Sequence, residues 1–330
     1  MIRIGGVQIS PPRQPPFELK IINRLLTRLP TQHQRYDEIL DRKNRIEAGY
    51  SGELNVDRVM HEIIFPPNTK ILKNIKLQVN PHYLFEIDTL ILSPSRIILL
   101  EVKNYYGTVY FDEELGKTIR VSPTGKKDYF DCAIHQLIRT EAALSRWFDK
   151  RNITIPIESI LVMANQQTII SEIPKTVPVK YRKQLPRYIS GLPKIPTILS
   201  CEEITRVAQK IEDSSQENYR LACERFNFQP SELKSGVLCS DCNGLMNRKR
   251  GQKWRCLNCG KYATQELYKA LEDWFLLIKP TISNAECRAF LNLNSKYAAS
   301  IILRHSKLSR KGKPPKTYYF YADKEQLYRK

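Results

Sequence analysis

Two Cys-x-x-Cys pairs near the C-terminal end constrain this chain more than any other feature. Cys239 and Cys242 form the first pair, Cys256 and Cys259 form the second, and thirteen residues separate the two. Each pair lets two thiolates from one tight turn reach the same ion, and four thiolates complete the closed shell of a structural Zn²⁺. A segment this short has too little core to fold without such a cross-link. We therefore predict a zinc ribbon over residues 236–262, with a redox dithiol or paired disulfides as the alternatives.

The charge of the chain is strongly positive and unevenly distributed. The 330 residues, enough for about two average domains, carry a formal net charge of +19. Residues 46–165 contain 14 basic and 15 acidic side chains, whereas residues 281–330 contain 11 basic and 3 acidic ones. Lys and Arg that neutralise phosphates release counterions, which favours binding to a polyanion such as DNA. A basic surface that only maintains solubility is the other interpretation.

The apolar segments indicate a protein without a membrane span. No apolar run approaches the ~18 residues that cross a bilayer. The first sixteen residues lack the apolar core of a secretory signal. We therefore expect a cytoplasmic protein whose eight cysteines are reduced, which makes metal binding a better prediction than disulfides.

The segment from Phe85 to Lys103 combines two apolar, β-rich runs with three charged residues. A turn centred between Pro94 and Ser95 would pair residues whose numbers sum to 189, and would place Asp88 opposite Glu101. Glu101 and Lys103 are two residues apart and share a face of their strand. Two carboxylates this close favour a hard divalent cation such as Mg²⁺ between them. A solvated hairpin face is the alternative, although the flanking positions are apolar.

Several short motifs in residues 46–165 together resemble the NERD (nuclease-related) domain of the PD-(D/E)xK nuclease superfamily. They are Gly49-Tyr-Ser-Gly-Glu53, Glu86-Ile-Asp88, Leu100-Glu-Val-Lys-Asn-Tyr-Tyr-Gly107 and His135-Gln136. The resemblance implies an α/β fold of the PD-(D/E)xK type, in which helices flank a four-stranded mixed sheet. It also implies a phosphodiesterase that depends on Mg²⁺ or Mn²⁺.

The resemblance assigns roles to five residues by their motif positions. It implies that Asp88 and Glu101 hold the catalytic metal and that Lys103 orients the attacking water and stabilises developing charge. Glu53 would be the acidic residue of the first helix, and Gln136 the polar residue of the following helix. All five match the family pattern, so the resemblance implies an active nuclease. A nuclease-like fold kept for binding alone is the alternative.

The remaining segments surround this domain. Residues 1–45 are expected to be a basic N-terminal arm, and residues 166–235 a connecting region with helices. Ser200 and Glu203 form a capping box that predicts a helix start. Within 46–165 the pattern predicts a helix over 52–62, strands over 71–79, 83–92, 96–102 and 157–164, a loop after 102, and a helix over 132–149.

Residues 263–330 resemble a winged helix-turn-helix, with three helices followed by a basic hairpin. A small helical tail with a basic loop would share most of these features. Candidate nucleic-acid contacts lie between the cysteine pairs, at the start of the third helix and in the basic loop: Arg248, Lys249, Arg250, Lys253, Trp254, Ser295, Lys296, Tyr297, Ser300, Arg310, Lys311, Lys313 and Lys316.

These features together predict a metal-dependent nuclease that is recruited to DNA by its C-terminal modules. A non-catalytic DNA-binding regulator or scaffold is the alternative from another class. RNA as the substrate is less well supported, because no RNA-binding signature is present in the sequence.

Overall fold

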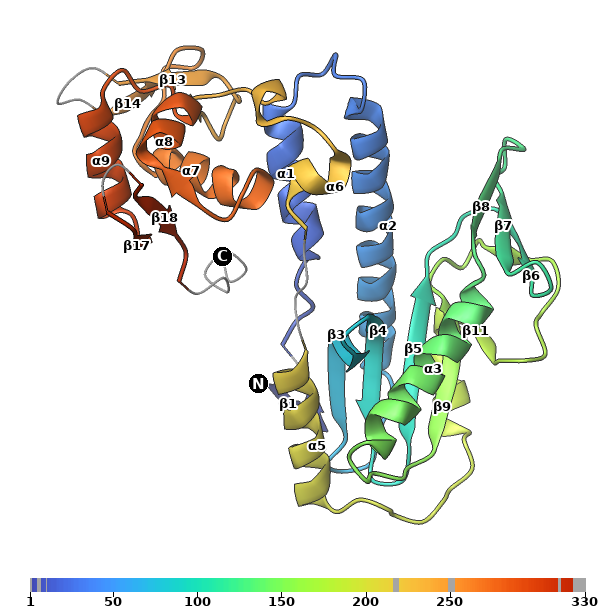
Figure 1. The fold of residues 1–330 in the computed structure, drawn as a ribbon. Coiled ribbons are helices and arrows are strands. Elements are labelled where there is room, and N and C mark those ends of the chain that lie inside the picture. Colours follow the sequence, from blue (N-terminus) through green and yellow to red (C-terminus); the bar gives the residue numbers. More distant parts are fainter. Residues whose placement is uncertain are drawn as a thin grey trace. The chain divides into compact units, whose positions relative to one another are not determined.

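The computed structural model describes residues 2–4, 7–9, 11–215, 220–248, 253–313 and 316–322, with side chains from residue 11 onward (Figure 1). The chain divides into two compact units. Unit 1 comprises Met1–Gln14 and Glu47–Asn218, and unit 2 comprises Pro15–Ile46 and Tyr219–Lys330. Among the described residues, every helix is too short or too polar to traverse a bilayer.

Unit 1 is built on a seven-stranded mixed sheet with the order β1-β2-β3-β4-β5-β9-β11. Neighbours from β3 to β5 are antiparallel, whereas β5, β9 and β11 run parallel. The four strands that the resemblance implies are β3, β4, β5 and β9, and three further strands extend them. The bounds are β1 Ile2–Ile4, β2 Val7–Ile9, β3 Lys70–Asn80, β4 Tyr83–Leu92, β5 Ile97–Lys103, β9 Ile157–Met163 and β11 Val179–Tyr181.

Helices cover both faces of this sheet, which is why its central strands are apolar on both sides. Leu99 faces a core that α3 (Ala133–Asp149) and α5 (Cys201–Ser214) complete, and Figure 1 shows α3 lying across β5 and β9. The adjacent Leu100 faces a second core with residues of α2 (Tyr36–Met60) and α4 (Leu185–Ser190). This alternation has the two-residue period of a strand. The predicted α/β class is confirmed, as is the capping box, in which Ser200 Oγ accepts from the N–H of Glu203.

The segment after β5 is a small sheet and not the loop that the sequence predicted. It contains β6 (Thr108–Asp112), β7 (Lys117–Val121) and β8 (Lys127–Asp131), and β10 (Ile169–Ile170) pairs with β6. The turns between these strands contain Gly116 and Gly125, whose φ angles of +67° and +82° suit glycine. These strands are short and polar, so they lack the apolar alternation on which the prediction depended.

Unit 2 contains residues that we expected to form a separate N-terminal arm. The boundary expected at residue 45 falls inside α2, and α1 (Phe17–Arg28) packs against α7 (Gln265–Leu277). Ile22 and Leu25 of α1 are fully buried in the core of the unit. This packing occurs because the apolar residues of α1 recur at helical spacing and form one continuous face.

The rest of unit 2 contains a small four-stranded sheet, helices and a hairpin. A sheet of order β12-β13-β14-β15 is formed by Val237–Leu238, Leu245–Asn247, Trp254–Cys256 and Tyr262–Ala263. After α7 come α8 (Asn284–Phe290) and α9 (Lys296–His305), together with a sheet of order β16-β18-β17. Its strands are β16 Ile282–Ser283, β17 Ser309–Lys311 and β18 Tyr318–Phe320. Three short elements complete the chain: η1 (Arg182–Gln184) in unit 1, and α6 (Ala222–Phe226) and η2 (Pro230–Glu232) in unit 2.

Candidate functional site

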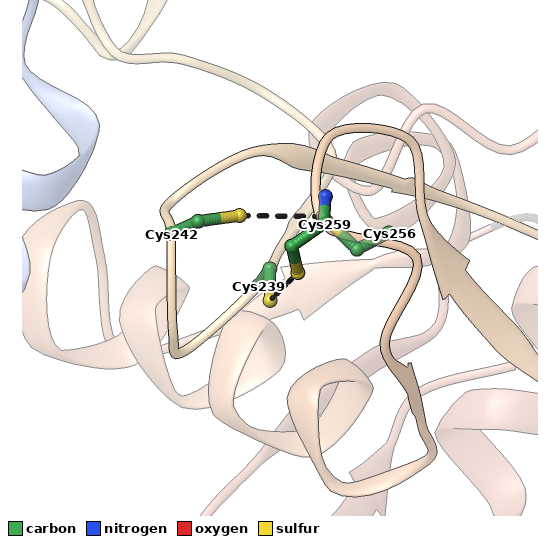
Figure 2. Close-up of side chains that lie close together, drawn as sticks. All are labelled: Cys239, Cys242, Cys256 and Cys259. Atoms are coloured by element: carbon green, nitrogen blue, oxygen red, sulfur yellow. Dashed lines mark hydrogen bonds between the residues drawn. The ribbon is translucent and has the colours of Figure 1, made fainter.

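The four cysteines of the two Cys-x-x-Cys pairs converge on one point in unit 2 (Figure 2). The sulfur atoms of Cys239 and Cys259 are 3.7 Å apart, those of Cys242 and Cys256 are 3.4 Å apart, and all four lie within 4.8 Å of one another. Sulfurs at the corners of a tetrahedron around Zn²⁺ would be ~3.8 Å apart, given Zn–S bonds of ~2.3 Å. The tetrad therefore fits zinc in both its geometry and its donor chemistry.

Small residues and backbone donors shape this tetrad. A Cβ on Gly244 would lie 3.2 Å from the sulfur of Cys256 and 2.8 Å from the Cβ of Asn258, so a larger residue would crowd the site. The backbone N–H groups of Cys259 and Asn258 point at the sulfur of Cys256, each at 3.4 Å, and they lower the pKa of that thiol to about 6. A thiolate at neutral pH is the form that binds a metal.

In unit 1, the predicted hairpin register brings the charged residues of β4 and β5 together. Thr89 pairs with Leu100 and Leu92 with Ile97, which is the register in which residue numbers sum to 189. The ladder ends after Thr89, one residue before the expected pairing of Asp88 with Glu101. There the Oδ2 atom of Asp88 accepts a hydrogen bond of 2.7 Å from the backbone N–H of Val102. The Asp88 carboxylate therefore lies against β5 beside Glu101.

Lys103 connects β5 to α3 at the same place. Its Nζ donates to Oε1 of Glu101 at 2.8 Å and to Oε1 of Gln136 at 2.9 Å. Glu101 is 2% exposed and Asp88 is partly buried, so the pair of carboxylates lies largely out of contact with solvent. Four of the five residues named by the resemblance thus meet at the end of β5.

The fifth residue, Glu53 of α2, is held by an arginine that sequence reasoning missed. The side chain of Arg13 is fully buried, and its Nη1 donates to Oε2 of Glu53 at 2.8 Å and also to Asn74. Its Nε donates to Asp57 at 3.1 Å, and its Nη2 donates to the backbone oxygen of Asp88 at 3.0 Å. Arg13 therefore connects α2 to the strand that carries Asp88.

The acidic side chains of this site raise one another's pKa values. Burial, together with the negative charge of Asp88, raises the pKa of Glu53 to about 7 against the opposing charge of Arg13. Burial and Asp88 likewise raise the pKa of Glu101 to about 7, although Lys103 opposes the shift. Burial lowers the pKa of Lys103, but the charges of Glu101 and Asp88 outweigh it, so that this pKa lies above its usual value. Like charges that raise each other's pKa values are typical of sites that bind a cation.

The chemistry of the two carboxylates fits a metal ion held by two protein ligands. The hydrogen bonds described for Asp88 and Glu101 engage one oxygen of each carboxylate, and the second oxygen is the type of ligand that Mg²⁺ prefers. Among the described residues, the cysteine tetrad is the only group of three or more His, Cys, Asp or Glu side chains that could hold a metal ion. An ion at the carboxylates would therefore need water or phosphate oxygens to complete its shell.

A family model matches part of the chain. The model of the nuclease-related domain matches residues 48–164, about a third of the chain. This segment is therefore similar to nuclease-related domains. The match covers α2 from residue 48 onward, β3 to β9 and α3, and therefore includes Glu53, Asp88, Glu101, Lys103 and Gln136. No curated protein and no solved structure matches the chain.

The candidate nucleic-acid contacts lie outside the nuclease-related domain, and the structure divides them into three groups. Lys249 and Arg250 are outside the described residues. The prediction that Trp254 contacts nucleic acid is wrong. This residue is 6% exposed and packs in the core of unit 2, where its ring cannot stack on a base. The exposed residues are Arg248, Lys253, Ser295, Lys296, Tyr297, Arg310, Lys311, Lys313 and Lys316.

Ser295, which precedes α9, and Ser300, which lies within it, also stabilise the local structure. Ser295 caps the helix, since its Oγ accepts from the backbone N–H of Tyr297 at 3.2 Å. Ser300 is half-buried, and its Oγ accepts from Asn284 at 2.7 Å. Lys296 and Tyr297 therefore remain the better candidates for contacts at the start of this helix.

Proposed function

We propose that this protein is a metal-dependent nuclease that hydrolyses DNA phosphodiester bonds at the site formed by Asp88, Glu101 and Lys103. The observation that carries the proposal is the position of Lys103 within a nuclease-related domain. Its ammonium group is fixed between Glu101 and Gln136, directly beside the Asp88 carboxylate. A permanent positive charge next to two acids suits a reaction in which negative charge develops on phosphoryl oxygens.

Each residue has a role in this proposal. Asp88 and Glu101 would hold Mg²⁺ or Mn²⁺, which when bound acidifies water and neutralises phosphoryl charge. Lys103 donates to the attacking water or to a phosphoryl oxygen. Gln136 keeps the Lys103 side chain extended along β5. Glu53 adds a third negative charge near Asp88, and Arg13 fixes its orientation.

Unit 2 would bring DNA to this chemistry. The order of α7, β16, α8, α9 and the β17–β18 hairpin is that of a winged helix-turn-helix. Lys296 and Tyr297 are exposed at the start of the helix that would enter the major groove, and Arg310, Lys311 and Lys313 are exposed on the hairpin. The zinc tetrad would fix the adjacent ribbon, on which Arg248 and Lys253 are exposed.

The test is incubation of the purified protein with plasmid and linear DNA in Mg²⁺ or Mn²⁺. Lys103→Ala and Asp88→Asn should each lower the cleavage rate by about 10²-fold or more, because each removes a charge that acts on the transition state. Lys127→Ala, an exposed basic residue of the same unit, is the matched control and should leave the rate unchanged. Equal rates for all variants and the parent would contradict the proposal.

A second function is favoured by one observation. Arg13 and Lys103 form ion pairs with Glu53 and Glu101 within the protein, so these two acids have partners without a metal. A non-catalytic DNA-binding scaffold would need no metal ion in addition to these ion pairs. Binding of DNA without cleavage in either metal would support this second function over the first.

A further inference from the structure

A run of positive charge in the region after the nuclease-related domain has no role in the function proposed above. Residues 173–201 contain six lysines and arginines and no aspartate or glutamate. The structure shows β11, the short helix η1 (Arg182–Gln184) and α4 in this stretch. Its charges therefore occupy defined positions in unit 1.

The sheet register places part of this run close to the candidate active site. Lys103 pairs with Met163, and Met163 pairs with Tyr181, so the three residues form one row across parallel strands. Neighbouring strands are ~4.8 Å apart, which puts the backbone of Tyr181 about 10 Å from that of Lys103. Arg182 and Lys183 follow directly. Carboxyl ends of parallel strands share an edge, and ligands of open α/β sheets bind at that edge.

The cations at this edge are held in place but have no acidic partner. In the described part of unit 1, no carboxylate forms an ion pair with Arg182, Lys183 or Arg187. Lys183 and Arg187 are exposed, and the Nε of Arg182 is buried without a hydrogen-bond partner. The backbone beneath them is anchored, because Leu185 is fully buried in the second core of the sheet. Fixed cations without counter-charges indicate an anionic ligand.

We propose that Arg182, Lys183 and Arg187 bind the phosphates of the nucleic-acid strand that enters the Lys103 site. The choice of nucleic acid rests on the proposed function. The rise of B-form DNA is ~3.4 Å per base pair, so about 10 Å spans about three base pairs along the helix axis, and these side chains would contact DNA close to the cleaved bond. They would supply phosphate contacts from unit 1 itself, in addition to those of unit 2.

The test is the salt dependence of DNA binding by the full chain. Fluorescence anisotropy of a labelled duplex is measured without added Mg²⁺ or Mn²⁺ over a series of KCl concentrations, so that cleavage does not interfere and zinc is retained. K183Q/R187Q changes two exposed residues, which keeps the fold intact. The slope of log K against log[KCl] is negative, and its magnitude should fall by about 2, since each lost phosphate contact removes about 0.9. R182Q added to this pair should lower it by about one more.

The matched control is K126Q/K127Q, which removes two exposed charges from the turn between β7 and β8 of the same unit. Its slope should equal that of the parent. An unchanged slope in K183Q/R187Q, or an equal loss in the control, would overturn the inference even if the parent cleaves DNA. A reduced slope in a protein that never cleaves DNA would support this binding surface and contradict only the nuclease proposal.

Discussion

The two candidate metal sites of this protein are assembled in opposite ways. The cysteine tetrad comes from two local turns within 21 residues, and its four thiolates converge without a charged partner in the core. The carboxylate site takes side chains from α2, β4, β5 and α3, and it is balanced by Arg13 and Lys103. This difference indicates which of the two units depends on a bound metal ion for its folding. Unit 1 contains the counter-charges it needs to fold, whereas the ribbon of unit 2 does not.

Removal of zinc should therefore have the largest effect, and only on unit 2. Cys256→Ser breaks the tetrad at a residue that is 1% exposed in the core of that unit. Zinc binding in small modules contributes on the order of 10 kcal/mol to folding, which exceeds the stability of most domains. Zinc content should fall to zero, and limited proteolysis should cleave unit 2 while unit 1 persists.

The control for this prediction is Cys201→Ser, which changes an exposed cysteine of unit 1 at the start of α5. It should retain zinc and the parental proteolysis pattern. A Cys256→Ser protein that still resists proteolysis throughout unit 2 would remove the contrast between the two sites.

Loss of Arg13 should be the next largest effect, and it should be confined to unit 1. Arg13→Leu leaves Glu53 and Asp57 with less compensation in a buried setting. Breaking a buried ion pair from one side costs about 3–5 kcal/mol, so the free energy of unfolding of unit 1 should fall by that amount in urea. Arg58→Leu, on the exposed side of α2, should change it by less than about 0.5 kcal/mol. A small loss for Arg13→Leu would show that Lys73 alone balances Asp57.

The same contrast explains how much of each site could be predicted from sequence. All four cysteines of the tetrad were identified, because the spacing of each pair lies within a single turn. The glycines that follow the two cysteine pairs have different roles. Gly260 has a positive φ, whereas in the first turn Asn243 takes the positive φ and Gly244 is needed for close approach to sulfur.

For the carboxylate site, only the part within one hairpin followed from the residues. The register of β4 and β5 depends on a turn and on alternating apolar positions, both of which are local. The contacts of Arg13 span 40 residues or more, and its surrounding prolines indicate only an extended segment. No pattern in the sequence connects it to Glu53. Trp254 was misjudged for a similar reason, since an aromatic between basic residues looks the same whether it is exposed or buried.

The pH dependence of stability in unit 1 should follow its two acidic residues when no metal is bound. Glu53 and Glu101 have pKa values raised to about 7, so their stabilising protonated forms are complete below about pH 4.5 and are lost as the pH rises through 7. Unit 1 should lose roughly 1–3 kcal/mol over this range in EDTA.

Chemical denaturation of unit 1 at pH 5 and pH 8 measures this effect. Added Mg²⁺ should restore more of the stability of unit 1 at pH 8 than at pH 5, because protons compete with the ion for the carboxylates. Stability of unit 1 that rises with pH in EDTA would contradict the electrostatic description of the site.

The smallest predicted effect is that of Tyr297. It distinguishes this residue from Trp254, the other aromatic residue that the sequence predicted to contact DNA. Tyr297 is 68% exposed at the start of α9, whereas Trp254 is 6% exposed. Tyr297→Ala should weaken DNA binding by about fivefold, equivalent to one contact of about 1 kcal/mol, and leave the melting temperature unchanged. Trp254→Ala should instead destabilise unit 2 by about 3–5 kcal/mol, because it leaves a cavity in the core. Anisotropy with a labelled duplex and thermal melting of the same samples distinguish the two effects. A Trp254→Ala protein with normal melting and weak DNA binding would restore the interpretation that its ring stacks on bases.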